Sequence, residues 1–110
     1  MEPMDVCIAN VPFDGSDKSK VRPALVVKIK DNYVSVFKIT SQYENKSEKI
    51  KRAYYPIKNW EIAGLNRISY VDTHQTYDID KVTIFKNRPI GKLTKEDVSG
   101  LYQFLQAKRS

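Results

Sequence analysis

The sequence predicts a mainly β protein, a small and strongly curled antiparallel sheet with one helix at its C-terminal end. Short runs rich in β-branched and aromatic residues, separated by turn-forming residues, occupy most of the chain. The run Tyr33–Thr40 has apolar side chains on both faces, which indicates burial on two sides rather than an open two-layer sheet. A helical period appears only after Thr94.

The first part of the chain contains three predicted strands. Asp5–Val11 is the first, and the polar, turn-rich segment Pro12–Lys20 follows it. Ala24–Ile29 and Tyr33–Thr40 are two further β-rich runs. The link Lys30–Asn32 between them contains an Asp-Asn pair that tolerates left-handed turn conformations, so these two runs predict a β-hairpin.

Beyond the hairpin the pattern weakens. Ser41–Lys51 is charged and has no sustained period, which is typical of a mobile loop. Further short β-type runs occupy Ala53–Ile57, Arg67–Thr73 and Val82–Phe85. Because no internal repeat and no Pro/Gly/Ser-rich linker divides the chain, we predict a single domain over residues 1–110.

The last predicted element is an amphipathic helix. Thr94 and Asp97 have the spacing of a capping box at its start. Four apolar residues then recur at i, i+3, i+4 and i+7, namely Val98, Leu101, Tyr102 and Leu105. Gly100 costs about 1 kcal/mol relative to alanine inside a helix, so packing on the sheet must supply the stability.

Composition and charge narrow the class of partner. Nineteen Lys and Arg against 13 Asp and Glu give a formal net charge of +6, which favours polyanions such as nucleic acid or acidic protein segments. The opening residues lack the pattern of a signal peptide, and no run approaches the roughly 20 apolar residues of a membrane span. We therefore expect a cytoplasmic protein.

The chain has one cysteine and one histidine, too few for a zinc site of the usual kind. Cys7 lies in an apolar stretch, which favours a small buried side chain over a nucleophile. We expect neither a cofactor nor a metal ion.

Arg22 stands directly before Pro23 at the start of a predicted strand. Proline fixes its own φ and extends the residue before it, so the guanidinium is aimed from a rigid position and can offer two parallel N–H donors to a phosphate. In the predicted hairpin, Thr40 lies at the same open end as Arg22. The ordinary alternatives are a solvated surface cation for Arg22 and a turn for the Thr40-Ser41 pair.

Five blocks of the sequence together resemble the MazF/PemK family, the ribonuclease toxins of type II toxin-antitoxin systems. In order they are Gly15-Ser16-Asp17, Val21–Val27, Ile39–Ser41, Gln75 with Ile79-Asp80, and Ile90–Leu93. The resemblance covers nearly the whole chain. It implies a small SH3-like barrel with a C-terminal helix, usually a homodimer, that cuts single-stranded RNA without a metal.

The resemblance also implies site residues. The family's arginine and threonine match Arg22 and Thr40, with Ser41 beside the latter, and these are the predicted catalytic positions. In metal-free cleavage the ribose 2′-OH attacks the adjacent phosphate and leaves a 2′,3′-cyclic phosphate and a 5′-hydroxyl. Such a site needs a proton acceptor, a proton donor and fixed positive charge.

The chain departs from the family at the positions that concern proton transfer. Asp17 stands where the family commonly has glutamate. Three residues of a later block also differ: His74, Tyr77 and Asp78. The candidates for moving protons are Asp17, Asp72 and His74. We expect His74 to do so, because an imidazole exchanges protons near neutral pH, and Asp17 to orient Arg22.

Aromatic and basic residues are interleaved along the chain, as in proteins that stack bases and follow phosphates of single strands. We expect Trp60 and most tyrosines to lie in the core and Tyr43 to face RNA. The predicted RNA-binding residues are Lys20, Gln42, Tyr43, Asp72 and Gln75. The further partner implied is an antitoxin with an acidic, disordered tail.

Three functions compete at this point. The first is a sequence-selective endoribonuclease toxin. The second is a non-catalytic barrel that binds RNA or inhibits another macromolecule, as a related family of plasmid toxins inhibits DNA gyrase. The third is a protein-interaction barrel, which the Arg22-Pro23 and Thr40-Ser41 pairs disfavour.

Overall fold

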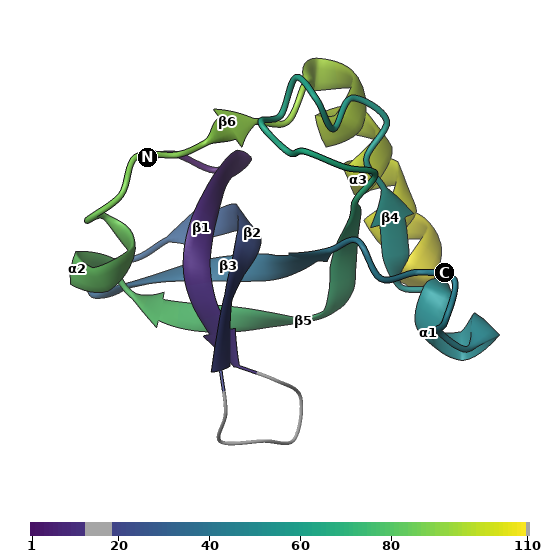
Figure 1. Ribbon diagram of the computed structural model, residues 1–110, viewed down its shortest axis with the longest axis horizontal. Helices are drawn as coiled ribbons and strands as arrows, with labels where there is room; N and C mark the ends of the chain where they lie inside the picture. The colour runs from purple at the N-terminus through teal and green to yellow at the C-terminus, as the bar shows by residue number, and fades with distance from the viewer. Residues whose placement is uncertain (13–18, 110) are drawn as a thin grey trace.

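The computed structural model describes residues 1–12 and 19–109 (Figure 1). Its strands are β1 (Asp5–Pro12), β2 (Ser19–Ile29), β3 (Tyr33–Thr40), β4 (Tyr54–Pro56), β5 (Tyr70–Asp80) and β6 (Gly91–Lys92). Its helices are α1 (Glu48–Lys51), α2 (Lys81–Ile84) and α3 (Lys95–Arg109).

The strands form one antiparallel sheet in the order β4-β5-β3-β2-β1-β6. Figure 1 shows β5 running along β3 and bending sharply toward β4 and α3. The bend lies at Thr73–Gln75, because the β3 pairing jumps there from Thr76 to Asp72. The prediction of a curled, mainly β fold is confirmed, and the sheet is barrel-like without closing, since β4 and β6 form its two edges.

Strand β3 lies in the middle of the sheet and is buried on both faces, as predicted. Every residue after Tyr33 is buried. Val34 and Val36 belong to one core cluster, and Phe37 and Ile39 belong to the other. The first cluster also contains Cys7, Ala9, Val11, Ala24, Val26, Ile79 and Ile84. The second includes Val6, Leu25, Val71, Leu93 and Leu101, and α3 packs against it.

The predicted burial of Cys7 is confirmed. Its thiol donates to the carbonyl oxygen of Ala24 at 3.7 Å. Burial, with a smaller contribution from the nearby Asp5 carboxylate, raises the pKa of the Cys7 thiol to about 11. The thiolate is therefore disfavoured, and Cys7 behaves as a core residue rather than a nucleophile.

Helix α3 begins as predicted and packs as predicted except at one position. The Thr94 hydroxyl oxygen accepts a hydrogen bond from the Asp97 amide at 3.3 Å. Leu101 is buried, but Tyr102 is 59% exposed, so its predicted place in the apolar stripe is wrong. Phe104 packs instead, with its ring centroid 5.8 Å from that of Tyr55. The helix approaches the sheet so closely that a Cβ at residue 100 would overlap the Tyr55 hydroxyl, which explains the glycine there.

The contact between α3 and the sheet centres on Asp97, whose side chain is fully buried. Its carboxylate accepts hydrogen bonds from the Tyr55 hydroxyl at 2.7 Å and from the amides of Lys58 at 2.9 Å and Asn59 at 2.8 Å. Burial, together with this hydrogen bond, raises the pKa of the Tyr55 phenol well above its usual value. Asp97 thus ties α3 to β4 and the segment that follows it.

Two local predictions differ from the structure. The β-type run Val82–Phe85 was predicted as a strand, which is wrong, because α2 occupies it. Only Ile84 of this helix is buried, and the Phe85 amide donates to the Lys81 carbonyl at 3.0 Å to close the turn. The charged segment Ser41–Lys51 contains the short helix α1, where the Ser47 hydroxyl oxygen accepts from the Ile50 amide at 3.3 Å. Across residues 1–12 and 19–109, no helix is both long and apolar enough to cross a membrane.

Candidate functional site

A groove of about 810 Å³ opens at the end of the β2–β3 hairpin where Arg22 and Thr40 lie. Its walls come from β1, β2, β3, β4 and the segments that follow β3 and precede β5. The polar residues that line it are Lys20, Arg22, Lys38, Thr40, Ser41, Gln42, Lys46, Asn66, Arg67 and Ser69.

The hairpin register brings Arg22 and Thr40 together. Ala24 of β2 pairs with Lys38 of β3, and Arg22 and Thr40 each lie two residues further toward the open end. Residues two apart on a strand share one face, so both residues line the same groove. On its other side, Arg22 pairs with Ala9 of β1. The predicted proximity of the two residues is confirmed, and their catalytic role stays a prediction.

Thr40 serves the fold and remains available for chemistry. Its hydroxyl oxygen accepts a hydrogen bond from the Gln42 amide at 3.0 Å, which fixes the turn after β3. A hydroxyl has one donor and two acceptor positions, so the O–H of Thr40 can still donate to a ligand. Ser41 and Gln42 follow it along the same wall of the groove.

The groove is strongly cationic. Five basic residues line it, Lys20, Arg22, Lys38, Lys46 and Arg67, and no Asp or Glu is among its described lining residues. A cleft lined by one sign of charge focuses the field and concentrates ligands of the opposite sign. The groove therefore favours an extended polyanion.

Asp72 and His74 form a hydrogen-bonded pair beside the groove. The Nδ1 atom of His74 lies 2.7 Å from Oδ1 of Asp72, and the His74 amide donates to the same oxygen at 3.0 Å. In a neutral imidazole that donates from Nδ1, the Nε2 atom is left as a proton acceptor. His74 does not line the groove, but its ring stands edge-on to Tyr54, which does, at 6.0 Å between centroids.

The bend of β5 presents His74. Residues 73–75 lie between two pairings with β3, Phe37 with Thr76 and Lys38 with Asp72. Thr73 anchors this bend, since its amide and hydroxyl both donate to the Ala53 carbonyl, at 2.9 Å and 2.7 Å. At the end of α3, the Lys108 ammonium donates to the Thr73 carbonyl at 3.2 Å.

Asp72 also contacts a lysine that does line the groove. Its Oδ2 atom lies 3.6 Å from Nζ of Lys38, and the two side chains are only 6% and 10% exposed. Asp72 itself is buried and is not among the described residues that line the groove. Its assignment as an RNA contact stays a prediction, and its observed partners are Lys38 and His74.

The other predicted site residues fall in three places. Lys20 and Gln42 line the groove. Tyr43 and Gln75 do not: the Tyr43 ring stacks on Tyr70 at 4.3 Å between centroids, and the Gln75 amide group donates to the Tyr77 hydroxyl at 3.1 Å. Asp17 lies outside the described residues.

Sequence reasoning assigned no site role to Lys38, Asn66 or Arg67. The position of Lys38 could have been predicted from the sequence. It stands two residues before Thr40 in a strand, where alternate side chains share a face, so it lies on the same face as Thr40. Arg67 belongs to the basic residues that are interleaved with aromatic ones, whereas Asn66 had no such signal. Both reach the groove from a segment without regular structure.

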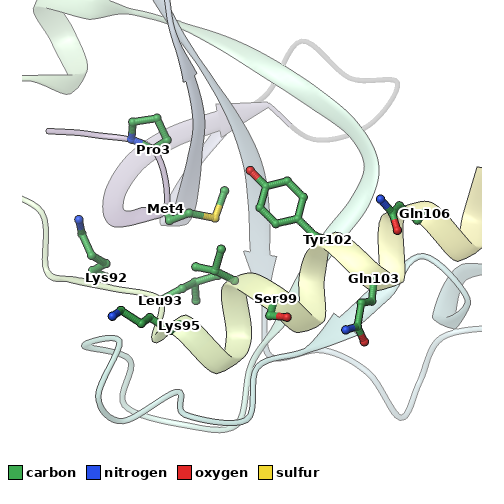
Figure 2. Close-up of a pocket in the computed structure, with 10 residues that line it drawn as sticks. Pro3, Met4, Lys92, Leu93, Lys95, Ser99, Tyr102, Gln103 and Gln106 are labelled. Carbon is green, nitrogen blue, oxygen red and sulfur yellow. The ribbon is translucent and has the colours of Figure 1, made fainter.

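A second groove, of about 570 Å³, lies between α3 and the N-terminal residues (Figure 2). Met4 and Leu93 form part of its apolar wall, Lys92 and Lys95 lie at one end, and Tyr102 rises from α3 beside it. None of its described lining residues is a His, Cys, Asp or Glu. The groove at Arg22 is therefore the better candidate for chemistry.

The protein is thus a small barrel-like domain, built from a curled six-stranded sheet and a C-terminal helix, with a cationic groove suited to binding a polyanion. The family model described as PemK-like, MazF-like toxin of type II toxin-antitoxin system matches residues 2–107, and the chain belongs to this family. Membership implies an antitoxin partner and an RNA substrate, and toxins of this family are generally endoribonucleases.

The fold agrees with a solved structure of the same kind. The Mycobacterium tuberculosis toxin MazF-mt6 superposes with a TM-score of 0.67 at 22% sequence identity, over 94% of this chain and 93% of that chain. At this identity the likeness shows a shared fold. A comparison with curated protein sequences finds no significant match.

Proposed function

We propose that this toxin is a metal-independent endoribonuclease that cleaves single-stranded RNA at preferred sequences. The observation that carries the proposal is the convergence of Arg22 and Thr40 in one groove lined by five basic residues and, among described residues, by no acidic one. The reaction is attack of a ribose 2′-oxygen on the adjacent phosphorus, with loss of the 5′-oxygen of the next nucleotide. The products are a 2′,3′-cyclic phosphate and a 5′-hydroxyl.

Arg22 supplies the fixed positive charge in this proposal. As the 2′-oxygen bonds to phosphorus, negative charge grows on the non-bridging oxygens, and a guanidinium can donate two parallel hydrogen bonds to them. Thr40 donates its O–H to the same phosphate, since its oxygen already accepts from the Gln42 amide. Ser41 adds a second hydroxyl on that wall.

His74 is the proposed proton-transfer group. Asp72 holds its Nδ1 and leaves Nε2 able to take the proton of the 2′-OH or, when protonated, to give one to the departing 5′-oxygen. The side chain of His74 is 41% exposed, so RNA lying along the groove past Tyr54 can reach it. Asp17, five residues before Arg22 in the sequence, is the other candidate.

The basic residues away from Arg22 bind the flanking nucleotides. Lys20 and Gln42 line the groove near Arg22 and Thr40, and Lys46 and Arg67 extend the cationic surface. Tyr43 already stacks on Tyr70, and Lys51 lies 4.8 Å from its ring centroid, so a base would have to join or displace these contacts. Base stacking on an aromatic side chain contributes about 1–3 kcal/mol per base.

The same groove supports the proposed control by an antitoxin. An acidic, disordered tail that orders over a cationic groove blocks substrate and gains charge-assisted hydrogen bonds. Co-expression with the adjacent open reading frame should restore growth. We also propose a homodimer, because β4 and β6 leave edges of the described sheet that a second chain can cover. A stable monomer in sedimentation at micromolar concentration would refute the dimer.

The experiment that tests the activity is incubation of purified protein with a long RNA in excess chelator. We expect discrete cuts with 5′-hydroxyl ends from the wild-type protein and far fewer from Arg22→Ala. Binding without cleavage would instead favour a non-catalytic barrel. Cleavage that needs a divalent cation, or that leaves 5′-phosphates, would contradict the proposed chemistry.

A further inference from the structure

Lys38 is a nearly buried lysine whose side chain forms part of the groove. It lies in β3 among residues that are all buried, and it is two positions before Thr40 on the same face. Lysine is almost never buried without a partner, because an ammonium loses its hydration there. A lysine at this buried position of the strand therefore needs a partner of opposite charge, which an apolar residue would not need.

Asp72 supplies the partner, and it is engaged from two sides. One oxygen accepts from His74, through Nδ1 at 2.7 Å and the amide at 3.0 Å, and the other lies 3.6 Å from the Lys38 ammonium. The register of β3 and β5 places Lys38 directly opposite Asp72. The carboxylate thus fixes the position of a cation on the groove side and of an imidazole at the bend of β5.

We propose that Lys38 is a phosphate-binding residue on the floor of the groove and that Asp72 positions it. The inference rests on the proposed function and assigns that site a second fixed cation. An ammonium has three N–H donors, so contact with Asp72 does not preclude a hydrogen bond to a phosphate oxygen. Two strand residues span about 6.6 Å, so Lys38 contacts the phosphate next to the one held at Thr40 rather than the scissile group itself.

Because Lys38 contacts a neighbouring phosphate, its loss should change different kinetic constants from the loss of Arg22. A residue that binds a neighbouring phosphate contributes equally in the ground state and the transition state, so its loss raises KM and changes kcat little. Loss of Arg22 lowers kcat, because its contacts strengthen in the transition state. A lysine that only neutralises Asp72 acts on the stability of the fold and, through His74, on kcat, and its loss leaves KM and the binding of RNA unchanged.

The test is the salt dependence of binding to an RNA with 2′-O-methyl groups throughout, which cannot be cleaved. For single strands the slope of log affinity against log salt is about −0.7 for each phosphate contact. We expect Lys38→Met to make the slope shallower by about 0.7 and to raise KM for cleavable RNA about tenfold. Lys38→Arg should keep the slope of the wild-type protein.

The matched control is Lys28→Met. Lys28 is exposed on β2, outside the lining of the groove, and its loss changes the net charge by the same amount. We expect its slope and KM to match those of the wild type. Equal effects of Lys28→Met and Lys38→Met would mean that only overall charge matters, which would overturn the assignment.

Lys38→Met leaves a buried carboxylate without its cation, which destabilises the fold. The same measurements are therefore made on Lys38→Met/Asp72→Leu, which removes both charges, after thermal melting has shown it to be folded. A shallow slope in this variant supports the proposal, and a wild-type slope overturns it. If the wild-type protein neither binds nor cuts RNA, the proposed function itself fails. If it does both and the Lys38 variants behave like it, only the role of Lys38 fails.

Discussion

Two buried carboxylates, Asp97 and Asp72, occupy opposite roles in this small protein. Asp97 lies in the first turn of α3 and accepts from neutral donors, the Tyr55 and Thr94 hydroxyls and the amides of Lys58 and Asn59. Asp72 lies beside the groove, and its partners are an ammonium and an imidazole. Burial is nearly equal, at 0% and 5% exposed. The partners, and not the burial, distinguish the two.

The different partners of Asp97 and Asp72 indicate two different uses of a buried carboxylate. The backbone amides that donate to Asp97 do not titrate, and burial raises the pKa of the Tyr55 phenol so that it keeps its proton at neutral pH; the Asp97 contacts therefore hold a helix on a sheet. Ammonium and imidazole groups can change protonation state and can turn toward a ligand, so the Asp72 contacts can serve a reaction. Variants on each side should therefore separate activity from stability.

The largest expected effect lies on the groove side. Arg22→Ala removes the guanidinium that would stabilise transition-state charge, and we expect kcat to fall about 10²–10³-fold. The thermal midpoint should change little, because Arg22 lies at the open end of the hairpin and outside both core clusters. Thr40→Ala, which removes a neutral donor, should lose less. A wild-type rate for Arg22→Ala would leave it as an ordinary surface cation.

The next largest expected effect is the loss of stability when Asp97 is replaced. Asp97→Ala leaves four donors without this acceptor, and we expect the free energy of unfolding to fall by about 3 kcal/mol, measured by urea denaturation. Glu96→Ala is the control, because this neighbouring carboxylate is exposed and accepts from the Asn59 side chain at 2.8 Å. It should cost about 0.5 kcal/mol. Cleavage per folded molecule should be unchanged in both, and a loss of activity in folded Asp97→Ala would break the comparison.

His74→Ala tests whether the Asp72 side transfers protons. We expect kcat to fall about 10²-fold and the pH–rate profile to lose the limb that an imidazole produces. Asp17→Asn should keep that limb. If His74→Ala cuts RNA with a wild-type pH profile, the histidine only completes the contacts of Asp72, and both carboxylates are structural.

The smallest effect is an alkaline loss of stability through Tyr55. The folded phenol, whose pKa is raised, holds its proton more tightly than the unfolded chain, whose phenol titrates near 10.0. The free energy of unfolding should therefore fall as pH rises above this value, by at most about 1.4 kcal/mol per pH unit. Cys7 acts in the same direction from 9.0 upward, so the series is measured by urea denaturation in Cys7→Ala and in Cys7→Ala/Tyr55→Phe. Equal slopes in the two proteins would contradict the assignment to Tyr55.

Features set by local sequence were predictable. The β2–β3 hairpin follows from two β-rich runs around a turn, and once it exists the period of two places Arg22 and Thr40 on one face at one end. The start of α3 at Thr94 follows from capping chemistry. The two-sided burial of β3 follows from its composition. The sequence by itself therefore determined the class of fold, the family and the two residues at the centre of the candidate site.

Only the tertiary structure decided which distant side chains meet. The pairing of Lys38 with Asp72 depends on the bend at residues 73–75, whose length no local pattern encodes. The same holds for α2, where the residues Val82–Phe85 have β-type composition but form a helix. It holds too for Tyr102, which is exposed, whereas Phe104 packs against Tyr55. Local propensity is worth a few tenths of a kcal/mol per residue, whereas burial of one large apolar side chain is worth about 1.5–3 kcal/mol. Packing between distant elements therefore overrides local preference where the two disagree.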